Sequence, residues 1–174
     1  MNQQRFLFCS RCGGAKVRRR SPVEFECEAC GFKHFTNPTV AVAAIIANRA
    51  GEILLIRRAK DPGRGKLSVP GGFVDPGETG EEAVRREVFE EVNLQVKAFQ
   101  YLASFPNQYQ FQDVIYPTLD VFFTAETETF AEARAKVEVQ SVIGVAPASV
   151  EFGEVAFPSV EKALRLYLVR LHRG

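Results

Sequence analysis

The sequence has no tryptophan, a single methionine and no marked excess of charge of either sign. Its 22 lysines and arginines against 21 aspartates and glutamates give a formal net charge of +1, so no general electrostatic attraction favours nucleic acid or an anionic membrane. The longest uninterrupted apolar run, Val40 to Ala47, is much shorter than the roughly 20 residues that cross a bilayer. The composition therefore argues against nucleic acid or a membrane as the main partner.

The sequence also lacks an apolar signal-peptide core near Met1, which leads us to expect a soluble cytoplasmic protein. Its hydrophobic fraction of 46% and charged fraction of 25% are ordinary for a globular chain and argue against disorder. We expect strands at 40–46, 53–56, 67–69, 95–104, 116–125 and 137–145, and helices at 80–92 and from Ser159 onwards. Strands on both sides of a central helix predict an α/β sandwich with a mixed sheet.

All four cysteines lie within the first thirty residues, in two C-x2-C pairs formed by Cys9, Cys12, Cys27 and Cys30. Four thiolates close a tetrahedral shell around Zn²⁺ without an open position, which is typical of a structural site. Two disulfides or four free thiols are the alternatives, and the lack of a secretory signal disfavours disulfides. We therefore expect a zinc ribbon over residues 1–36, ending before the Asn37-Pro38 turn, and a second domain over 37–174.

A basic stretch lies between the two cysteine pairs and comprises Lys16, Arg18, Arg19 and Arg20. Zinc ribbons often bind nucleic acid, and these cations would suit phosphate contacts. Three glutamates follow directly and dilute the charge, so a solvated hairpin tip is the favoured interpretation and nucleic-acid binding a minor hypothesis.

The helix predicted over 80–92 carries a cluster of carboxylates. Thr79 and Glu82 form a capping-box pattern at its start, and Asn93 tolerates the left-handed conformation that ends a helix. At about 100° per residue, Glu87, Glu90 and Glu91 fall within one arc of roughly 100°. Clustered hard oxygen ligands suit Mg²⁺ or Mn²⁺, whereas the alternative interpretation is a solvated acidic helix face.

Together with the preceding loop, this helix resembles the signature of the Nudix hydrolases, G-x5-E-x7-R-E-U-x-E-E-x-G-U, where U is aliphatic. The signature is matched, except for Asn93 in place of its last glycine, by Gly72, Glu78, Arg86, Glu87, Val88, Glu90 and Glu91. The ribbon, this domain and the final helix are together similar to the zinc-ribbon subgroup, whose members act on ADP-ribose, FAD or NADH. Related NADH pyrophosphatases carry a tryptophan-containing motif where this chain reads Tyr101 to Asn107.

The resemblance implies a Nudix α/β/α sandwich with a mixed sheet, preceded by the small ribbon. It also implies Mg²⁺- or Mn²⁺-dependent hydrolysis of a nucleoside diphosphate linked to another moiety, with release of AMP. The implied catalytic metal ligands are Glu87, Glu90 and Glu91 with Gly72 and Glu78. In the same interpretation, Arg86 orients a metal-binding glutamate, and Glu138 is the late candidate for the general base.

Substrate contacts are assigned to Arg57 or Arg58, which end a strand pointing towards the site, and to Phe73 as a stacking aromatic. Two alternatives stay open: a housecleaning hydrolase of nucleoside triphosphates, and a ligand-sensing regulator that binds nucleic acid. The complete set of Glu87, Glu90 and Glu91 argues against the ligand-sensing regulator. A homodimer is also left open, because Phe89 lies off both the acidic arc and the apolar stripe of its helix, which is formed by Val84, Val88 and Val92.

Overall fold

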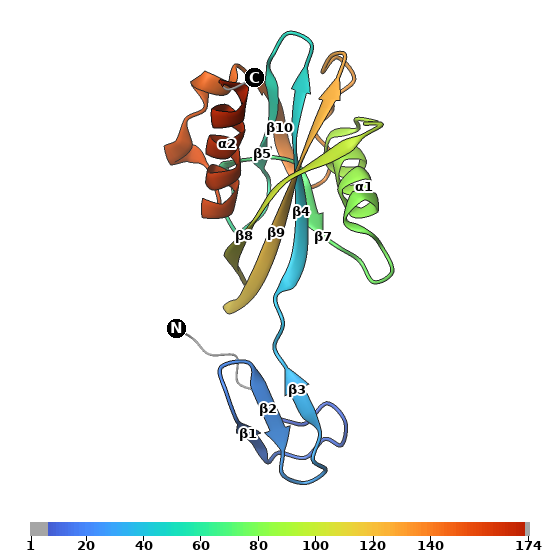
Figure 1. Cartoon of the computed structure of the whole chain (residues 1–174), viewed down its shortest axis with the longest axis vertical. Coiled ribbons are helices and arrows are strands. Elements are labelled where there is room, and N and C mark those ends of the chain that lie inside the picture. Colours follow the sequence, from blue (N-terminus) through green and yellow to red (C-terminus); the bar gives the residue numbers. More distant parts are fainter. Residues whose placement is uncertain (1–6, 173–174) are drawn as a thin grey trace.

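The computed structural model describes residues 7–172. At one end of the elongated molecule, three short antiparallel strands form a small sheet in the order β1-β2-β3 (Figure 1). These strands are β1 Val17–Arg19, β2 Glu24–Cys27 and β3 Lys33–Phe35. The next strand belongs to a different sheet and begins at Thr39. The division into a ribbon at 1–36 and a domain at 37–174 stays a prediction.

Seven strands form the large sheet, in the order β10-β5-β4-β9-β8, with β6 paired to β5 and β7 paired to β4. Strands β4 and β9 run parallel and the other pairs antiparallel, which confirms the predicted mixed sheet. The strands are β4 Thr39–Asn48, β5 Ile53–Arg58, β6 Leu67–Ser68, β7 Gly71–Phe73, β8 Phe99–Phe111, β9 Val114–Thr127 and β10 Val139–Val145.

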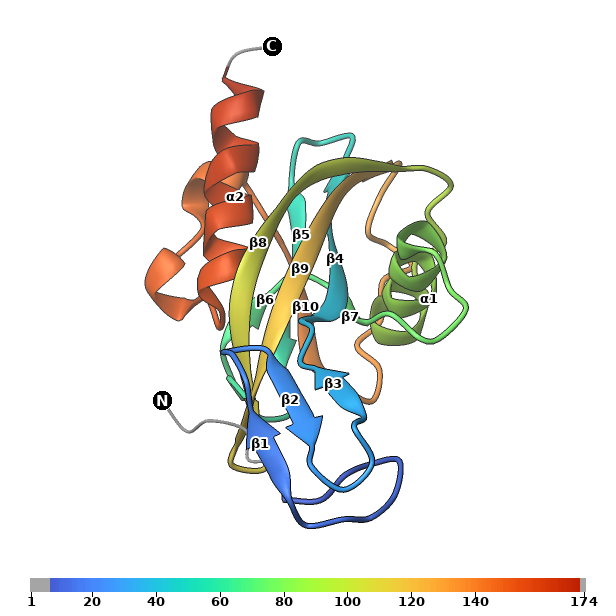
Figure 2. The ribbon, with the colours of Figure 1, turned by 60° about the horizontal axis from the view of Figure 1, so that its bottom comes forward.

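One helix covers each face of this sheet, so the fold is the expected α/β/α sandwich (Figure 2). Helix α1, Gly80–Val92, buries Val84, Val88 and Val92 against one face. Helix α2, Pro158–Leu171, packs on the other face after two short 3-10 turns, η1 Pro147–Ser149 and η2 Phe152–Glu154. None of the helices within residues 7–172 has the length and apolarity needed to span a membrane.

Helix α1 begins and ends as the sequence predicts. The Thr79 hydroxyl accepts from the Glu82 N–H at 3.2 Å, and the Glu82 carboxylate accepts from the Thr79 N–H at 2.8 Å, which completes the capping box. Asn93 ends the helix at φ 60° in the left-handed region. Asparagine tolerates this conformation better than most non-glycine residues, which accounts for its place where the Nudix signature has glycine.

The sequence predicts three segments incorrectly. Residues 95–98, expected to begin a strand, precede β8, which starts at Phe99. Residues 107–113, expected to join two strands, are mostly strand, because β8 and β9 continue to a tight turn at Gln112 and Asp113 with φ of 46° and 62°. Two consecutive positive φ angles match the twist of a two-residue hairpin. The segment 71–73, expected as part of a glycine-rich loop, forms strand β7 along β4.

The start of α2 is also corrected. Ser159 is not its cap: the helix begins at Pro158, and Phe157 precedes it without a side-chain cap. Proline suits the first helical position because its missing N–H would have no helical partner there. Ser159 is fully buried, and its hydroxyl donates at 2.6 Å to Oδ2 of Asp120 in β9. Its polar side chain therefore ties the helix to the sheet.

Candidate active site

A cleft of about 250 Å³ opens where strands β4 and β5 separate. The two strands pair near Ala47 and Ile53, and further along β7 pairs with β4 while β6 pairs with β5. The cleft is therefore lined by backbone and side chains of all four strands, together with residues from α1, β8, β9 and the start of α2. A site assembled from so many segments is suited to hold a ligand with several distinct parts.

Three glutamates line this cleft: Glu87 and Glu91 from α1, and Glu138 from the residue before β10. Glu91 is only 6% exposed, and its Oε2 accepts a hydrogen bond from the Gly71 N–H at 2.9 Å. Burial raises the pKa of Glu91 to about 8. Burial also raises the pKa of Glu87, although hydrogen bonding to Arg86 opposes this. Poor solvation thus disfavours the charged form of these carboxylates, and a bound cation would stabilise that form.

Arg86 organises the carboxylates around the start of α1. Its Nε and Nη2 donate to the two oxygens of Glu78 at 2.7 and 2.8 Å, and its Nη1 donates to Glu87 at 2.7 Å and Glu90 at 3.3 Å. Its Nη2 also donates to the Phe73 carbonyl at 3.1 Å. Hydrogen bonding from Arg86 lowers the pKa of Glu78 to about 2, and these carboxylates raise the pKa of Arg86. Arg86 is absent from the cleft lining, consistent with a positioning role.

Glu90 lies outside the main cleft. Its side chain is 56% exposed and lines an adjoining groove, which shares Glu87, Glu91 and Glu138 with the cleft. The metal-ligand candidates of α1, Glu87, Glu90 and Glu91, are therefore neighbours along one connected surface. Glu138 itself is 60% exposed, and its carboxylate pairs with Lys60 Nζ at 2.6 Å. It is placed beside the glutamates, but its negative charge is already partly balanced.

Gly72 packs directly against the Glu87 carboxylate. A Cβ at this position would lie 2.5 Å from Cδ of Glu87, so any larger residue would displace that side chain. At the preceding residue, Gly71, a Cβ would collide with the Val42 carbonyl oxygen in β4. Both glycines allow β7 to lie between β4 and α1, which brings the backbone of the signature loop to the acidic face.

The structure separates the two arginines that the sequence proposes as phosphate ligands. Arg58 lines the cleft, donates to the Pro62 carbonyl at 2.8 Å and lies over the Phe157 ring at 5.0 Å. Arg57 points elsewhere: it donates to the Gly65 carbonyl at 2.6 Å, lies 3.6 Å from the Glu154 carboxylate and is not part of the cleft lining. Alternation of side chains along β5 sends these neighbours to opposite faces, so Arg57 is corrected to a residue outside the cleft.

Phe73, the expected stacking residue, does line the cleft and packs edge-on against Tyr109 with ring centroids 5.3 Å apart. Phe157 continues this aromatic group, 6.0 Å from Tyr109. The same lining holds a polar set that is not among the residues predicted from the sequence: Asn107, Thr118 and Asp120. Polar residues two apart in a strand that is otherwise apolar were the available signal, because period-two spacing places them on one face.

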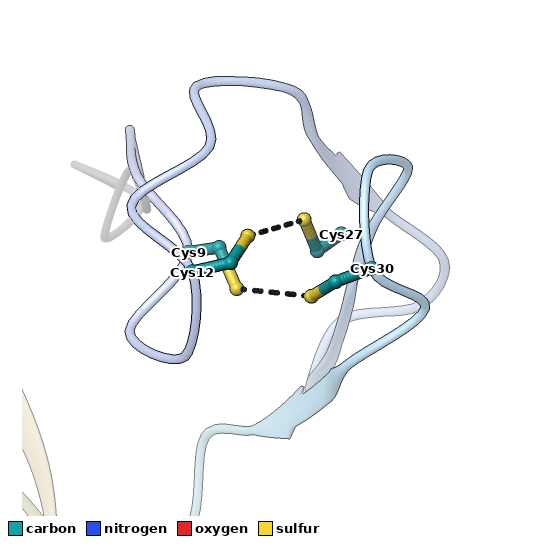
Figure 3. Close-up of side chains that lie close together, drawn as sticks. All are labelled: Cys9, Cys12, Cys27 and Cys30. Carbon is teal, nitrogen blue, oxygen red and sulfur yellow. Dashed lines mark hydrogen bonds between the residues drawn. The ribbon is translucent and has the colours of Figure 1, made fainter.

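The four cysteines converge as expected for a metal site (Figure 3). Their sulfurs all lie within 4.8 Å of one another, with 3.8 Å between Cys9 and Cys30 and 3.7 Å between Cys12 and Cys27. Zn–S bonds of about 2.3 Å in a tetrahedron require sulfurs about 3.8 Å apart. All four thiols are free, so the disulfide alternative is not the one the structure adopts. The donor set therefore fits Zn²⁺.

The glutamate set also fits Mg²⁺ or Mn²⁺ in its chemistry. Glu91 is a buried carboxylate with a raised pKa, and among the described residues only the Gly71 N–H donates a hydrogen bond to it. Glu87 lies in the same lining, and Glu90 in the groove beside it. Hard divalent cations prefer such oxygen ligands, and bound charge would offset the cost of burying Glu91.

The NUDIX domain family matches residues 37–172 of the chain. The chain belongs to the NUDIX family. The chain has 38% identity over 102 residues to a protein of Haemophilus influenzae (strain PittGG) named NAD-capped RNA hydrolase NudC, covering 57% of this chain and 38% of that protein. A protein of Stutzerimonas stutzeri with the same name is 36% identical over 97 residues, covering 56% of this chain and 34% of that protein.

Among solved structures, the NUDIX fold of this chain is similar to that of a NUDIX hydrolase from Nitrosomonas europaea, with a TM-score of 0.79 and 26% identity. That similarity covers 96% of this chain and 93% of the solved one. By contrast, the chain spans less than two fifths of the length of the curated relatives it matches. The likeness to those relatives therefore concerns only part of their length.

Proposed function

We propose that this NUDIX protein is a divalent-metal-dependent pyrophosphohydrolase. Its proposed substrates are nucleoside diphosphates linked to another moiety, of the ADP-ribose, FAD or NADH type, and AMP is one product. The observation that carries the proposal is the meeting of Glu87, Glu91 and Arg58 in one cleft, with Glu90 in the groove beside it. Carboxylates that can hold divalent cations then lie beside a fixed guanidinium that can bind phosphate.

Each polar group of the cleft has a distinct proposed role. A diphosphate resists hydrolysis because its negative oxygens repel an incoming hydroxide, and Mg²⁺ or Mn²⁺ bound by Glu87, Glu90 and Glu91 would neutralise that charge and acidify a bound water. Arg86 fixes Glu87 through its 2.7 Å hydrogen bond and thereby positions a metal ligand. The Gly72 backbone and Glu78 are retained as further candidates for the metal shell.

Glu138 is the proposed general base. It shares the cleft lining with Glu87 and Glu91, so its carboxylate is within the region where an attacking water would be activated. Its ion pair with Lys60 is largely exposed, with side-chain exposures of 60% and 55%. An exposed pair of this kind contributes little stability and is readily opened. Glu138 can therefore leave Lys60 and accept a proton without a large cost to the fold.

The substrate class rests on the composition of the cleft. Beyond the carboxylates, the lining continues through Phe73, Tyr109 and Phe157 to polar residues of β8 and β9. A triphosphate hydrolase needs room for one base, one sugar and a phosphate chain, whereas a dinucleotide-like substrate also carries a second group. Two relatives of this chain are named as hydrolases of NAD-capped RNA, which supports a substrate with an NAD-like end.

Nucleic acid as part of the substrate is not favoured by the ribbon. The basic stretch between the cysteine pairs forms ion pairs with the glutamates that follow it: Arg18 with Glu28 at 2.7 Å and Arg20 with Glu26 at 2.6 Å. Lys33 is similarly paired with Glu24 at 3.0 Å. This balance of charge supports a small-molecule substrate and the interpretation of the stretch as a solvated hairpin.

The proposal is tested with a substrate panel. The purified protein is incubated with Mg²⁺ and ADP-ribose, FAD, NADH or nucleoside triphosphates in ¹⁸O-labelled water, and the products are identified by mass spectrometry. We expect AMP from at least one dinucleotide-like substrate, with the label in a phosphate-bearing product because attack is at phosphorus. Hydrolysis of nucleoside triphosphates alone would establish the rival hydrolase function. No hydrolysis of any of them would contradict both.

A further inference from the structure

A second polar group lines the cleft, apart from the carboxylates of α1. At its centre, Asp120 of β9 is buried, with 9% of its surface exposed. Its carboxylate accepts three hydrogen bonds: from Thr118 Oγ1 at 2.7 Å, from Asn107 Nδ2 at 2.9 Å and from Ser159 Oγ at 2.6 Å. Asp120, Asn107 and Thr118 face the cleft, while Ser159 is outside the lining and holds the carboxylate from behind.

The buried carboxylate has no cationic partner in the described part of the chain, where no lysine or arginine forms an ion pair with Asp120. A hydrogen bond that links β9 to α2 would require only Ser159 as donor. Burying a charged carboxylate costs free energy, so this link alone does not account for Asp120. Three donors use three of the roughly four acceptor sites of a carboxylate. Asp120 can therefore accept one further hydrogen bond from the cleft.

The neighbours of Asp120 strengthen this acceptor character. The single hydroxyl proton of Thr118 is committed to Asp120, so its oxygen can only accept from a ligand. Asn107 commits one of its two N–H donors in the same way. The polar surface offered to a ligand is therefore dominated by acceptors. It favours a ligand group that carries N–H donors and disfavours one that presents oxygen acceptors.

Flat apolar walls lie in the same cleft. Phe73 and Tyr109 pack edge-on at 5.3 Å, and Tyr109 and Phe157 lie 6.0 Å apart with an interplanar angle of 36°. All three rings line the cleft together with Asp120. Aromatic walls favour planar rings through their large contact area, but they do not distinguish one ring from another. Discrimination must come from the polar group.

We propose that Asn107, Thr118 and Asp120 form a specificity subsite for a planar ring bearing an amino or carboxamide N–H donor. The inference rests on the proposed function, since it assigns one ring-bearing end of the dinucleotide-like substrate. An adenine amino group and a nicotinamide carboxamide both supply this donor. Hypoxanthine and nicotinate, which present oxygen at the corresponding position, would place acceptor against acceptor. Asp120 is a substrate-contacting residue in this scheme and Ser159 a positioning residue.

Binding of mononucleotides tests the subsite without any need for turnover, because these ligands contain no diphosphate to cleave. AMP is compared with IMP, and nicotinamide mononucleotide with nicotinate mononucleotide, by isothermal titration calorimetry with and without Mg²⁺. A hydrogen bond to a charged group, lost and replaced by an unfavourable contact, is worth about tenfold or more in Kd. We expect at least one pair to show this preference. The pair that does so identifies the ring bound there.

Three variants assign the preference to Asp120. Asp120→Asn exchanges one acceptor oxygen for a donor and should reduce the preference to threefold or less. Tyr109→Leu should weaken AMP and IMP binding by similar factors and leave their ratio unchanged, because ring contacts are common to both. Asp113→Asn, at the exposed tip of the same hairpin, is the matched control and should bind as wild type does.

The possible results separate this inference from the proposed function. No preference in either ligand pair for the wild-type protein, or a full preference retained in a folded Asp120→Asn protein, would overturn the subsite. If Asp120→Asn does not fold, the comparison of the two ligand pairs on the wild-type protein alone decides whether the subsite exists. Release of AMP from ADP-ribose without any amino preference would leave the hydrolase function standing and the subsite wrong. A preference for the amino-bearing ligand without any hydrolysis would leave the subsite standing and the hydrolase function wrong.

Discussion

Arg86 holds Glu78 through two parallel hydrogen bonds, Nε to Oε1 at 2.7 Å and Nη2 to Oε2 at 2.8 Å. The same guanidinium reaches Glu87 at 2.7 Å and Glu90 at 3.3 Å. One arginine thus connects the loop before α1 with two of the three glutamates on its acidic face. A lysine cannot reproduce this fork, since its ammonium is a point charge without paired planar donors.

Arg86→Lys is therefore expected to reduce kcat at least about tenfold with a smaller effect on KM, because it disturbs the metal ligands and not the substrate contacts. Affinity for Mn²⁺, measured by electron paramagnetic resonance, should fall in parallel. Arg85→Lys is the matched control: Arg85 is exposed and donates to the Lys97 carbonyl at 3.3 Å. Equal kinetic effects of the two substitutions would contradict the positioning role of Arg86.

Glu78 and Glu91 should affect stability with opposite signs. Arg86 lowers the pKa of Glu78 from 4.5 to about 2, so Glu78 stabilises the fold above pH 4.5 and this contribution is lost as the pH falls towards 2. Burial raises the pKa of Glu91 from 4.5 to about 8, so its ionisation destabilises the fold increasingly as the pH rises from 4.5 to 8.

In metal-free protein at pH 8, Glu78→Gln should therefore lower Tm and Glu91→Gln should raise it, each by a few degrees. The glutamine oxygen of Glu91→Gln can still accept from the Gly71 N–H. As followed by circular dichroism, the Glu91→Gln difference should shrink as the pH falls from 8 to 4.5, and the Glu78→Gln difference should shrink only below pH 4.5, towards pH 2. Two shifts of the same sign at pH 8 would contradict the electrostatic account of these carboxylates.

Much of the fold follows from the sequence because its signals are local. Thr79, Glu82 and Asn93 define both ends of α1 by capping alone. The length of β8 and β9 could not be read in the same way, since residues 107–113 are polar and gain their strand structure only by pairing across the hairpin. Pairing between distant segments is not encoded in local composition.

The acidic face of α1 was predictable from helical spacing. Which of its side chains face the cleft and which face the adjoining groove was not predictable. Glu91 faces the cleft while Glu90 faces the adjoining groove, because α1 lies against β7 at a particular rotation. The difference between Arg57 and Arg58 likewise depends on which face of β5 borders the gap. Asp120 was missed because its donors come from β8, β9 and α2.

Gly72→Ala tests the close approach of β7 to α1. The added Cβ would lie 2.5 Å from Cδ of Glu87, so the carboxylate must move away from its place in the cleft. We expect kcat for AMP release to fall by more than tenfold, with the protein still folded. Gly153→Ala is the control, because a Cβ there meets no atom within 4 Å. Wild-type turnover in Gly72→Ala would show that the position of Glu87 does not matter.

Cys9→Ser tests the zinc ribbon. Removing one of four thiolates should release about one zinc per chain and lower the stability of the ribbon, with little direct effect on the chemical step. Zinc content is measured by elemental analysis, with the exposed neighbour substitution Ser10→Ala as control. Freshly purified wild-type protein that contains no zinc would rule out the structural site.

The central claim is that the glutamates of α1 support hydrolysis of a diphosphate, and AMP release from ADP-ribose by Glu90→Gln and Glu91→Gln tests it most directly. Each substitution removes a charged oxygen ligand while preserving side-chain size, so folding should be kept, as verified by circular dichroism. We predict that both variants lose at least about 100-fold in kcat relative to wild type. Turnover within threefold of wild type in both folded variants would contradict the account.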